Sequence, residues 1–199
     1  MTYEEFYGAD YQRLKAAEAH LTQSILQYQC LLEDRGDFPV IEFCRSRIKS
    51  PESMSAKLQK RGIPVNAEAA LTRVNDALGI QIVCSFFSDI YRAASWLRNH
   101  PDFRVLQIKD YIAHPKRSGY RSYHVILEIL SGEGKGIRAE VQIRTVALDF
   151  WADLEHQLQY KRQAGAPEPP ADDLRRCADD LISADLSIQT MRDIILSEL

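Results

Sequence analysis

The chain has 199 residues, 45% hydrophobic and 27% charged, which is typical of one folded domain and excludes a chain disordered throughout. Its four cysteines form no C-x-x-C pair, the N-terminus has no apolar signal region, and no apolar run approaches the roughly 18 residues of a membrane span. We therefore expect a cytoplasmic protein with no membrane partner. The net charge of −3 combines acidic ends with a basic middle, which favours a localised phosphate site and argues against a DNA-binding surface.

The first third of the chain predicts helices around one short strand. Residues 3–33 carry apolar residues at spacings of three and four, as in one long helix or two, and "GDFP" ends this pattern. "VIEFCRSRIKS" is a candidate strand. A helix follows it, with Ser50 as N-cap, Pro51 at the first position and Gly62 after the last turn.

The central part alternates strands and helices. "LGIQIVCSFF" and "FRVLQIKDY" are predicted strands, separated by a helix that we expect Ser88 to cap. "SYHVILEIL" and "IRAEVQIRT", joined by "SGEGKG", predict a β-hairpin, and a helix follows with Val146, Phe150, Leu154 and Leu158 on one face. This order indicates an α+β fold, a mixed and mainly antiparallel β-sheet flanked by helices.

The C-terminal segment begins with the proline-rich loop "QAGAPEPPAD". Beyond it, apolar residues follow a heptad pattern of about three repeats, from Leu174 to Ile195. Such a helix can pack on its own domain or form a subunit contact. We expect an N-terminal helical extension over 1–40, a central domain over 41–162, and a C-terminal helical extension over 163–199 that mediates oligomerisation.

Two groups of residues suggest phosphate chemistry near the middle of the chain. In "RSRIKSPESMSAKLQKR", Arg45, Arg47 and Lys49 alternate toward one side of an extended segment, while Lys57, Lys60 and Arg61 lie at the far end of the helix. Serines at the helix start suit phosphate oxygens, although the cations there also complement the helix dipole. Asp76 and Glu140 are candidate Mg²⁺ ligands, although spacing alone does not show that they meet.

The stretch "KDYIAHPKRSGYRSYH" places cationic and aromatic residues at the start of a predicted strand. Gly119 permits a tight bend, and Tyr120 can present its ring to a base. Asp149 could accept hydrogen bonds from N1–H and N2–H₂ of a guanine. The cations able to hold a phosphate chain are Lys109, Lys116, Arg121 and His124.

From about residue 41 to 162 the chain resembles the small alarmone synthetases of the RelA/SpoT family. The motifs that carry this resemblance are "RIKSPESM", "DALGIQIV", "KDYIAHPKRSGYRSYH" and "EVQIRTVALDFWADLEHQLQYK", in the order and spacing of the family. The length leaves no room for a hydrolase domain or a long regulatory tail. The resemblance implies a nucleotidyltransferase-like synthetase domain that works alone.

The resemblance also implies a reaction. A β,γ-pyrophosphate would pass from ATP to the ribose 3′-hydroxyl of GTP or GDP with Mg²⁺, giving the stringent-response alarmones pppGpp or ppGpp. Asp76 and Glu140 would be the metal and catalytic carboxylates, and Glu140 would help to deprotonate the 3′-hydroxyl. By motif position, the ATP-binding residues would be Arg47, Lys49, Ser53, Lys57, Lys60 and Gln81. The GTP/GDP-binding residues would be Lys109, Lys116, Tyr120, Arg121, His124, Gln142 and Asp149.

One position departs from the family pattern, because Gln81 stands where members usually carry an arginine that sandwiches adenine with the residue at Arg47. Glutamine supplies no cation–π contact of the same strength, and Arg45 is a candidate to compensate. Some small members are tetramers whose central cleft binds the alarmone as an allosteric ligand. Phe43 matches an aromatic residue of that cleft, so a homotetramer regulated in this way is one expectation.

Two alternatives remain at this point. Some members of the family are toxins that pyrophosphorylate the tRNA 3′ end or adenine nucleotides, but the acidic ends of this chain offer little basic surface for RNA. A non-catalytic nucleotide-binding module is favoured by Gln81 and opposed by the presence of both Asp76 and Glu140.

Overall fold

The computed structural model describes residues 1–33, 38–163 and 171–198, so the predicted break at "GDFP" and the predicted loop "QAGAPEPPAD" fall largely outside the described residues. The described helices are α1 (Tyr3–Tyr7), α2 (Asp10–Glu33), α3 (Pro51–Lys60), α4 (Ala67–Thr72), α5 (Phe87–Asn99), α6 (Val146–Gln163) and α7 (Ala171–Ser197). The described strands are β1 (Ile41–Ile48), β2 (Leu78–Cys84), β3 (Phe103–Asp110), β4 (Tyr123–Ile129) and β5 (Arg138–Thr145). Helix α4 was not predicted from the sequence.

The strands form one five-stranded sheet in the order β1-β2-β5-β4-β3. Strands β2 and β5 run parallel, whereas every other neighbouring pair is antiparallel. The predicted hairpin of β4 and β5 is present, and Gly132 and Gly136 adopt positive φ in its turn. The α+β class with a mixed, mainly antiparallel sheet is therefore confirmed.

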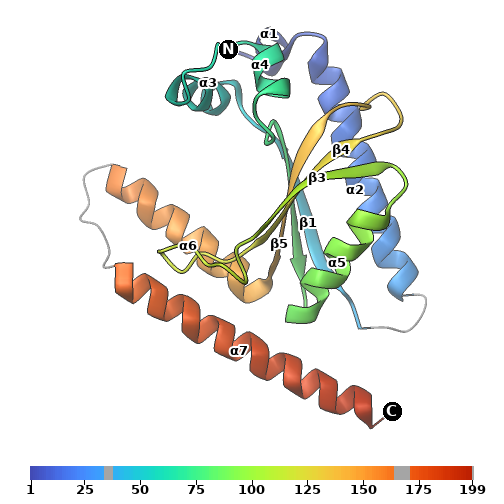
Figure 1. Ribbon diagram of the computed structural model, residues 1–199, viewed down its shortest axis with the longest axis vertical. Coiled ribbons are helices and arrows are strands. Elements are labelled where there is room, and N and C mark those ends of the chain that lie inside the picture. Colours follow the sequence, from blue (N-terminus) through green and yellow to red (C-terminus); the bar gives the residue numbers. More distant parts are fainter. Residues whose placement is uncertain (34–37, 164–170, 199) are drawn as a thin grey trace.

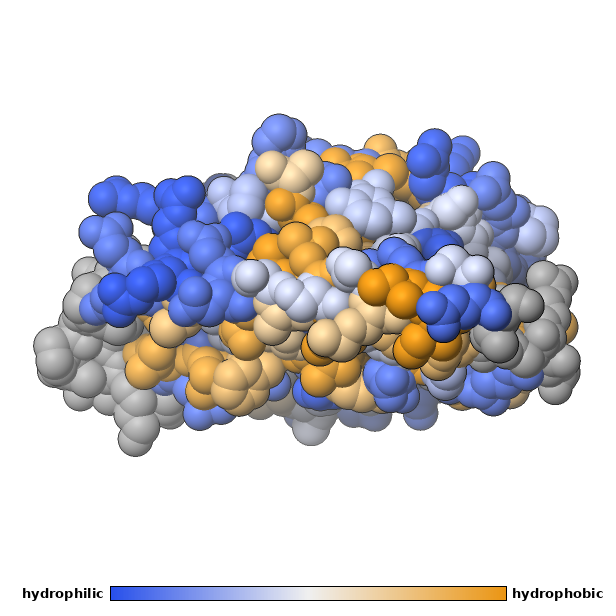
Figure 2. Space-filling view, turned by 90° about the horizontal axis from the view of Figure 1, so that it is seen from below, coloured by the Kyte–Doolittle hydropathy of each residue, from blue (hydrophilic) through white to orange (hydrophobic). Residues whose placement is uncertain are grey.

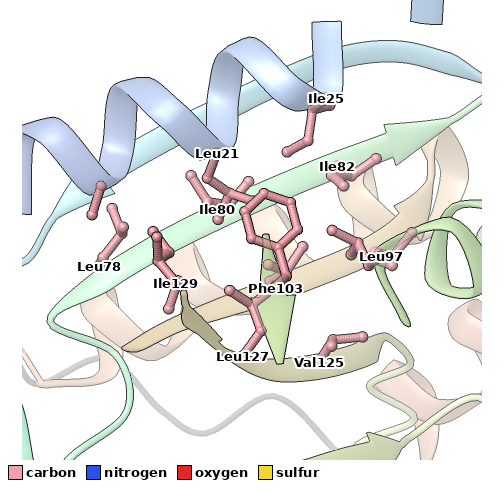
Figure 3. Close-up of a cluster of buried hydrophobic side chains, with 14 of the residues drawn as sticks. Leu21, Ile25, Leu78, Ile80, Ile82, Leu97, Phe103, Val125, Leu127 and Ile129 are labelled. Carbon is pink, nitrogen blue, oxygen red and sulfur yellow. The ribbon is translucent and has the colours of Figure 1, made fainter. Parts of the chain in front are cut away.

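One face of the sheet is apolar and covered by helices. Helices α2 and α5 lie against it (Figure 1), and Leu21 and Ile25 of α2 pack with strand residues such as Ile80 and Leu127 (Figure 3). Alternation along each strand sends every second residue to this face. The buried N-terminal helix belongs to the same hydrophobic core as the sheet, so its 3,4 spacing is explained by packing on the central domain.

The opposite face of the same strands is polar, and it carries the candidate site. On β5 the residues Glu140, Gln142 and Arg144 alternate with the buried Ala139, Val141 and Ile143. Cross-strand register aligns Gln81 of β2 with Arg45 of β1 on one side and with Gln142 on the other, and Gln142 in turn with His124. A single row of polar side chains therefore crosses the sheet.

The prediction that Ser88 caps α5 is wrong. The helix begins at Phe87, its N-cap is Phe86, and no side chain makes the capping hydrogen bond. The backbone N–H of Ser88 instead donates to Oε1 of Gln189 in α7 at 3.0 Å. The helix therefore begins before Ser88, and a distant helix satisfies one of the backbone N–H groups of its first turn.

Helix α7 packs on the domain through buried polar contacts as well as through the start of the predicted apolar seam, where Leu174 and Leu181 contact the buried cluster of Tyr120 and Trp151. Arg192 donates two hydrogen bonds to the fully buried Asp89 of α5, at 3.0 and 3.1 Å, and Thr145 at the end of β5 donates to Asp185 at 2.5 Å. The seam residues Ile188, Met191 and Ile195 are at least half exposed. None of the described helices is long and apolar enough to cross a bilayer.

Candidate active site

Two lysines and one carboxylate meet where β1 leads into α3. Both Lys49 Nζ and Lys57 Nζ lie 2.5 Å from Oδ2 of Asp76, which precedes β2. Burial alone would raise the pKa of Asp76, but hydrogen bonds and charge from the two lysines hold that pKa below its usual value. The structure therefore brings together two lysines predicted to bind ATP and one predicted metal ligand, with Asp76 ionised.

The second oxygen of Asp76 fits a metal ligand. Among the described residues, no group donates a hydrogen bond to the buried Oδ1 of Asp76, although buried carboxylate oxygens normally have partners. Asp76 also lies near enough to Glu140 for its charge to oppose the ionisation of Glu140. The described residues contain no cluster of three or more metal-ligating side chains, so substrate phosphates would have to complete the coordination of an ion held by this pair.

Three of the remaining residues expected to bind ATP lie on β1, which ends just before Lys49, and on α3, which carries Lys57. Ser50 caps α3 as predicted, since its Oγ accepts from the N–H of Ser53 at 3.3 Å. Lys60 lies one turn beyond Lys57, at the exposed end of the helix. The exposed Arg47 crosses over Gly79 of β2, where an added Cβ would lie 3.7 Å from Cγ of Arg47. Arg47 therefore lies along the sheet within van der Waals distance of a Cβ at position 79.

Glu140 receives hydrogen bonds on both carboxylate oxygens. His124 Nδ1 lies 3.3 Å from Oε1, and Gln142 Nε2 donates to Oε2 at 3.3 Å. Burial acts to raise the pKa of Glu140, but these contacts outweigh it and the pKa is lowered. The pKa of His124 is lowered by its own burial, and Arg144 and Lys116 add to that effect. Glu140 is therefore an oriented carboxylate beside a neutral imidazole.

Sequence reasoning missed Arg144, which lies at the centre of this site. The residue is buried, and its guanidinium donates to the Tyr120 hydroxyl and to Oε1 of Gln142 at 2.6 Å each, and to Oδ1 of Asp149 at 3.1 Å. Because arginine only donates, the Tyr120 oxygen accepts and its proton points to His124 Nε2, 2.9 Å away. The alternation of β5, which places Arg144 on the same face as Glu140, was the signal that could have found it.

Asp149, which was expected to bind guanine, contacts a residue that was expected to bind ATP. Besides Arg144, its carboxylate accepts from Gln81 Nε2 and, at 3.2 Å, from Arg45 Nη2. The Asp149 side chain is only 5% exposed, so these three donors account for most of its hydrogen-bonding capacity. A guanine would have to replace some of them. Gln81, expected beside adenine, therefore lies in contact with the residue expected to read guanine.

The loop between β3 and β4, residues 111–122, is here named the acceptor loop. Its residue Tyr120 is largely buried, with Lys116 Nζ 4.5 Å above the ring and the Arg144 guanidinium at 5.2 Å from its centroid. Lys109 precedes the loop at the end of β3, beside His124 in register. The Arg121 guanidinium does not turn toward Glu140 but donates to Asp179 of α7 at 2.7 Å.

Paired acids, a lysine pair on one of them and an aromatic ring beside guanidinium groups define a nucleotide site suited to phosphoryl chemistry. The family model described as "Region found in RelA / SpoT proteins" matches residues 46–165. The chain belongs to this family.

Two curated relatives come from Bacillus subtilis (strain 168). GTP pyrophosphokinase YwaC is 42% identical over 142 residues, which cover 70% of this chain and 68% of the relative. GTP pyrophosphokinase YjbM is 36% identical over 166 residues, which cover 81% and 77% respectively. The similarity therefore extends over most of the length of both relatives.

Solved structures agree over nearly the whole chain. Small alarmone synthetase 1 from Bacillus subtilis bound to its product pppGpp has a TM-score of 0.83 at 32% identity and covers 92% of this chain and 95% of its own. A GTP pyrophosphokinase family protein from Streptococcus pneumoniae has a TM-score of 0.86 at 31% identity, with coverage of 100% and 97%. The terminal helices are thus part of the shared architecture.

Proposed function

We propose that this chain is a GTP pyrophosphokinase, which transfers the β,γ-pyrophosphate of ATP to the ribose 3′-hydroxyl of GTP or GDP. The products are AMP and the alarmone pppGpp or ppGpp, signals of the stringent response. The observation that carries the proposal is a pair of carboxylates whose oxygens have different hydrogen-bond partners. Asp76 has one oxygen held by lysines and one unpaired, whereas Glu140 has donors on both oxygens.

In the proposed reaction, the 3′-oxygen attacks the β-phosphorus of ATP and the bond from that phosphorus to the α,β-bridging oxygen breaks. Glu140 takes the proton of the 3′-hydroxyl, because it is ionised and its orientation is fixed by His124 and Gln142. Lys49 and Lys57 neutralise charge on the ATP phosphates. Arg47 lies on the exposed polar side of β1, where it can stack on adenine.

The unpaired oxygen of Asp76 and the carboxylate of Glu140 would hold Mg²⁺, and hard oxygen ligands suit this ion. Bound there, the ion would neutralise phosphate charge and help to align the two substrates. The lysines on Oδ2 keep Asp76 ionised in the absence of the metal, because they favour the charged form of the carboxyl.

Tyr120 is the proposed base-stacking residue of the acceptor, and Asp149 the proposed partner of guanine N1–H and N2–H₂. Both lie on the polar side of the sheet within reach of Arg144. Stacking would require Lys116 to leave the ring of Tyr120, where its ammonium now lies. Lys116 would then be free to join Lys109 on the acceptor phosphates.

Incubating the purified protein with ATP labelled at the γ-phosphate and, separately, with GTP, GDP, GMP, ATP or tRNA tests the proposal. We expect label on GTP or GDP. Labelled tRNA, or a labelled adenine nucleotide other than the ATP donor, would assign the chain to the toxic branch. No transfer to any acceptor, in the presence of Mg²⁺, would indicate a non-catalytic module.

We also propose that the chain assembles into a homo-oligomer, a tetramer, through α6 and α7. The stripe predicted on α6 faces solvent, since Val146 and Phe150 are 50% and 58% exposed. Figure 2 views the side on which α7 lies, and hydrophobic residues gather there in a band. Exposed apolar surface of this kind typically marks an interface. We further propose that an alarmone binds at the centre of this assembly, beside Phe43. We also propose a cytoplasmic location.

A further inference from the structure

The acceptor loop is in close contact with α7. Gly119, at φ +90°, leaves so little space that an added Cβ would lie 2.8 Å from Cβ of Ala178 and 3.0 Å from Cα of Arg175. Ala178 is buried with Tyr120 and Trp151 in a small cluster separate from the main core. The backbone of the loop is therefore in contact with α7 at its tightest bend.

Arg121 extends this contact through charge. Its Nη2 donates to Oδ1 of Asp179 at 2.7 Å, and its Nη1 donates to the carbonyl oxygen of Gly119 at 3.2 Å. The arginine side chain is 13% exposed, whereas that of Asp179 is 51% exposed. Each terminal nitrogen of the guanidinium thus makes one hydrogen bond, one to the loop itself and one to α7, and neither contact is to a residue of the Glu140 network.

The contacts with α7 stabilise the loop conformation that determines the position of Tyr120. A turn closes between Lys116 and Tyr120, with Gly119 N–H donating to Lys116 O at 2.9 Å and Lys116 N–H donating to Tyr120 O at 3.1 Å. Arg121 is the next residue after Tyr120. An anchor at this point limits the positions that the Tyr120 ring can adopt, and preorganisation of a binding group increases affinity by lowering the ordering cost.

We propose that Arg121 and Asp179 form a clamp that positions the acceptor loop. Arg121 is then a positioning residue, rather than the phosphate ligand that its motif suggests, and α7 contributes to acceptor binding as well as to assembly. This inference deepens the proposed function and rests on it for the identity of the acceptor. It requires no metal and no change in the chemistry at Glu140.

A charge swap separates the two roles of Arg121. The variants are Arg121→Glu, Asp179→Arg and the double variant carrying both, with Asp180→Arg as the matched control, because Asp180 is the next residue of α7 and is also exposed. For each we would measure KM for GDP, KM for ATP and kcat, and GDP binding by calorimetry. Hydrogen exchange of the amides of residues 116–122 gives a readout that does not depend on turnover.

If the clamp positions the loop, Asp179→Arg raises KM for GDP about fivefold, the factor that corresponds to about 1 kcal/mol for a partly exposed ion pair. KM for ATP and the control variant stay at the wild-type values. The double variant recovers both GDP affinity and slow amide exchange, because the ion pair is restored with its charges reversed.

If Arg121 binds phosphate instead, Asp179→Arg leaves GDP affinity unchanged or improves it, and the double variant remains as weak as Arg121→Glu. Either result overturns the clamp. A wild-type protein that does not use guanine nucleotides would refute the proposed function alone. The exchange data would still decide the clamp, since faster amide exchange in Asp179→Arg and its recovery in the double variant support it and unchanged exchange contradicts it.

Discussion

Replacing Gln81 by arginine restores the residue that the family usually carries, but the structure predicts that it weakens ATP binding. Gln81 faces Arg45 directly across β1 and β2, and both side chains donate to Asp149. A second guanidinium at position 81 would compete with Arg45 for this carboxylate, which Arg144 already contacts. The site is therefore arranged around glutamine, with Arg45 close to the place of the missing cation.

The size of the effect follows from the cross-strand distance. Directly opposed side chains of an antiparallel pair lie about 5 Å apart, and two like charges at that distance repel by about 0.8 kcal/mol in water. The dielectric of water is appropriate because the Arg45 side chain is 53% exposed. We expect KM for ATP to rise about fourfold in Gln81→Arg, which is the factor for that energy. Removing the competing charge by Arg45→Ala should lower KM again, at least to the wild-type value.

Steady-state kinetics of Gln81→Arg, Arg45→Ala and the double variant, at saturating GDP, test this reasoning. KM for GDP is measured in parallel, because Gln81 and Arg45 both contact Asp149, the proposed partner of guanine. A lower KM for ATP in the single variant Gln81→Arg would refute it, since Arg45 would then not occupy the position of the missing arginine. Unchanged values in all three variants would show that position 81 does not touch the donor base.

Three further predictions follow from the same contacts. Glu140→Gln should abolish pyrophosphate transfer while circular dichroism stays unchanged, because the amide keeps the size but loses the base and the metal-binding charge; substantial residual turnover would contradict that role. Arg144→Lys should raise KM for GDP about tenfold and leave KM for ATP nearly unchanged. A single ammonium nitrogen cannot reach the partners that the planar guanidinium contacts through two separate nitrogens, so about 1.4 kcal/mol of charged hydrogen bonding is lost. Equal effects on both substrates would argue against this role. Ile188→Asp with Ile195→Asp should reduce the mass measured by light scattering. These exposed positions are preferable to Leu181, which packs beside the buried Tyr120 cluster. A monomeric wild type would refute assembly through this face.

Local patterns predicted most of the fold. Helix α3 was placed from Ser50, Pro51 and Gly62, because caps act within one or two turns and need no tertiary information. The hairpin of β4 and β5 followed from alternation and glycines in the same way. Ser88 does not cap α5 because the helix already begins at Phe87, and Gln189, more than 100 residues away in the sequence, accepts from the Ser88 backbone N–H in the first turn. Such a contact leaves no local signal.

In the candidate site, too, local motifs could be predicted from the sequence, whereas contacts between distant segments could not. Sequence motifs selected Lys49, Lys57 and Asp76, and the structure brings the three together. The parallel pairing of β2 with β5, which sets Gln81 beside Gln142, could not be read from the sequence, because it joins strands separated by more than fifty residues. For the same reason the contact of Gln81 with Asp149 was not anticipated.

The apolar residues of α6 and α7 were correctly placed on helices, but a single sequence does not distinguish a core face from an interface. On α2 the same 3,4 spacing leads to complete burial of Leu14 and Leu21, whereas on α7 it leaves Ile188 and Met191 exposed. The difference arises because the C-terminal half of α7 docks through Asp185 and Arg192, whereas Leu174 and Leu181 nearer its start do pack on the domain.

The most direct test of the central claim is the identity of the product formed from ATP and GDP. We would separate the products by ion-exchange chromatography and assign the phosphates by ³¹P NMR and mass spectrometry. The account predicts AMP and a guanosine nucleotide that carries an intact pyrophosphate on the ribose 3′-oxygen, in equal amounts. Formation of ADP, transfer of a single phosphate, or a pyrophosphate on any other oxygen would contradict it.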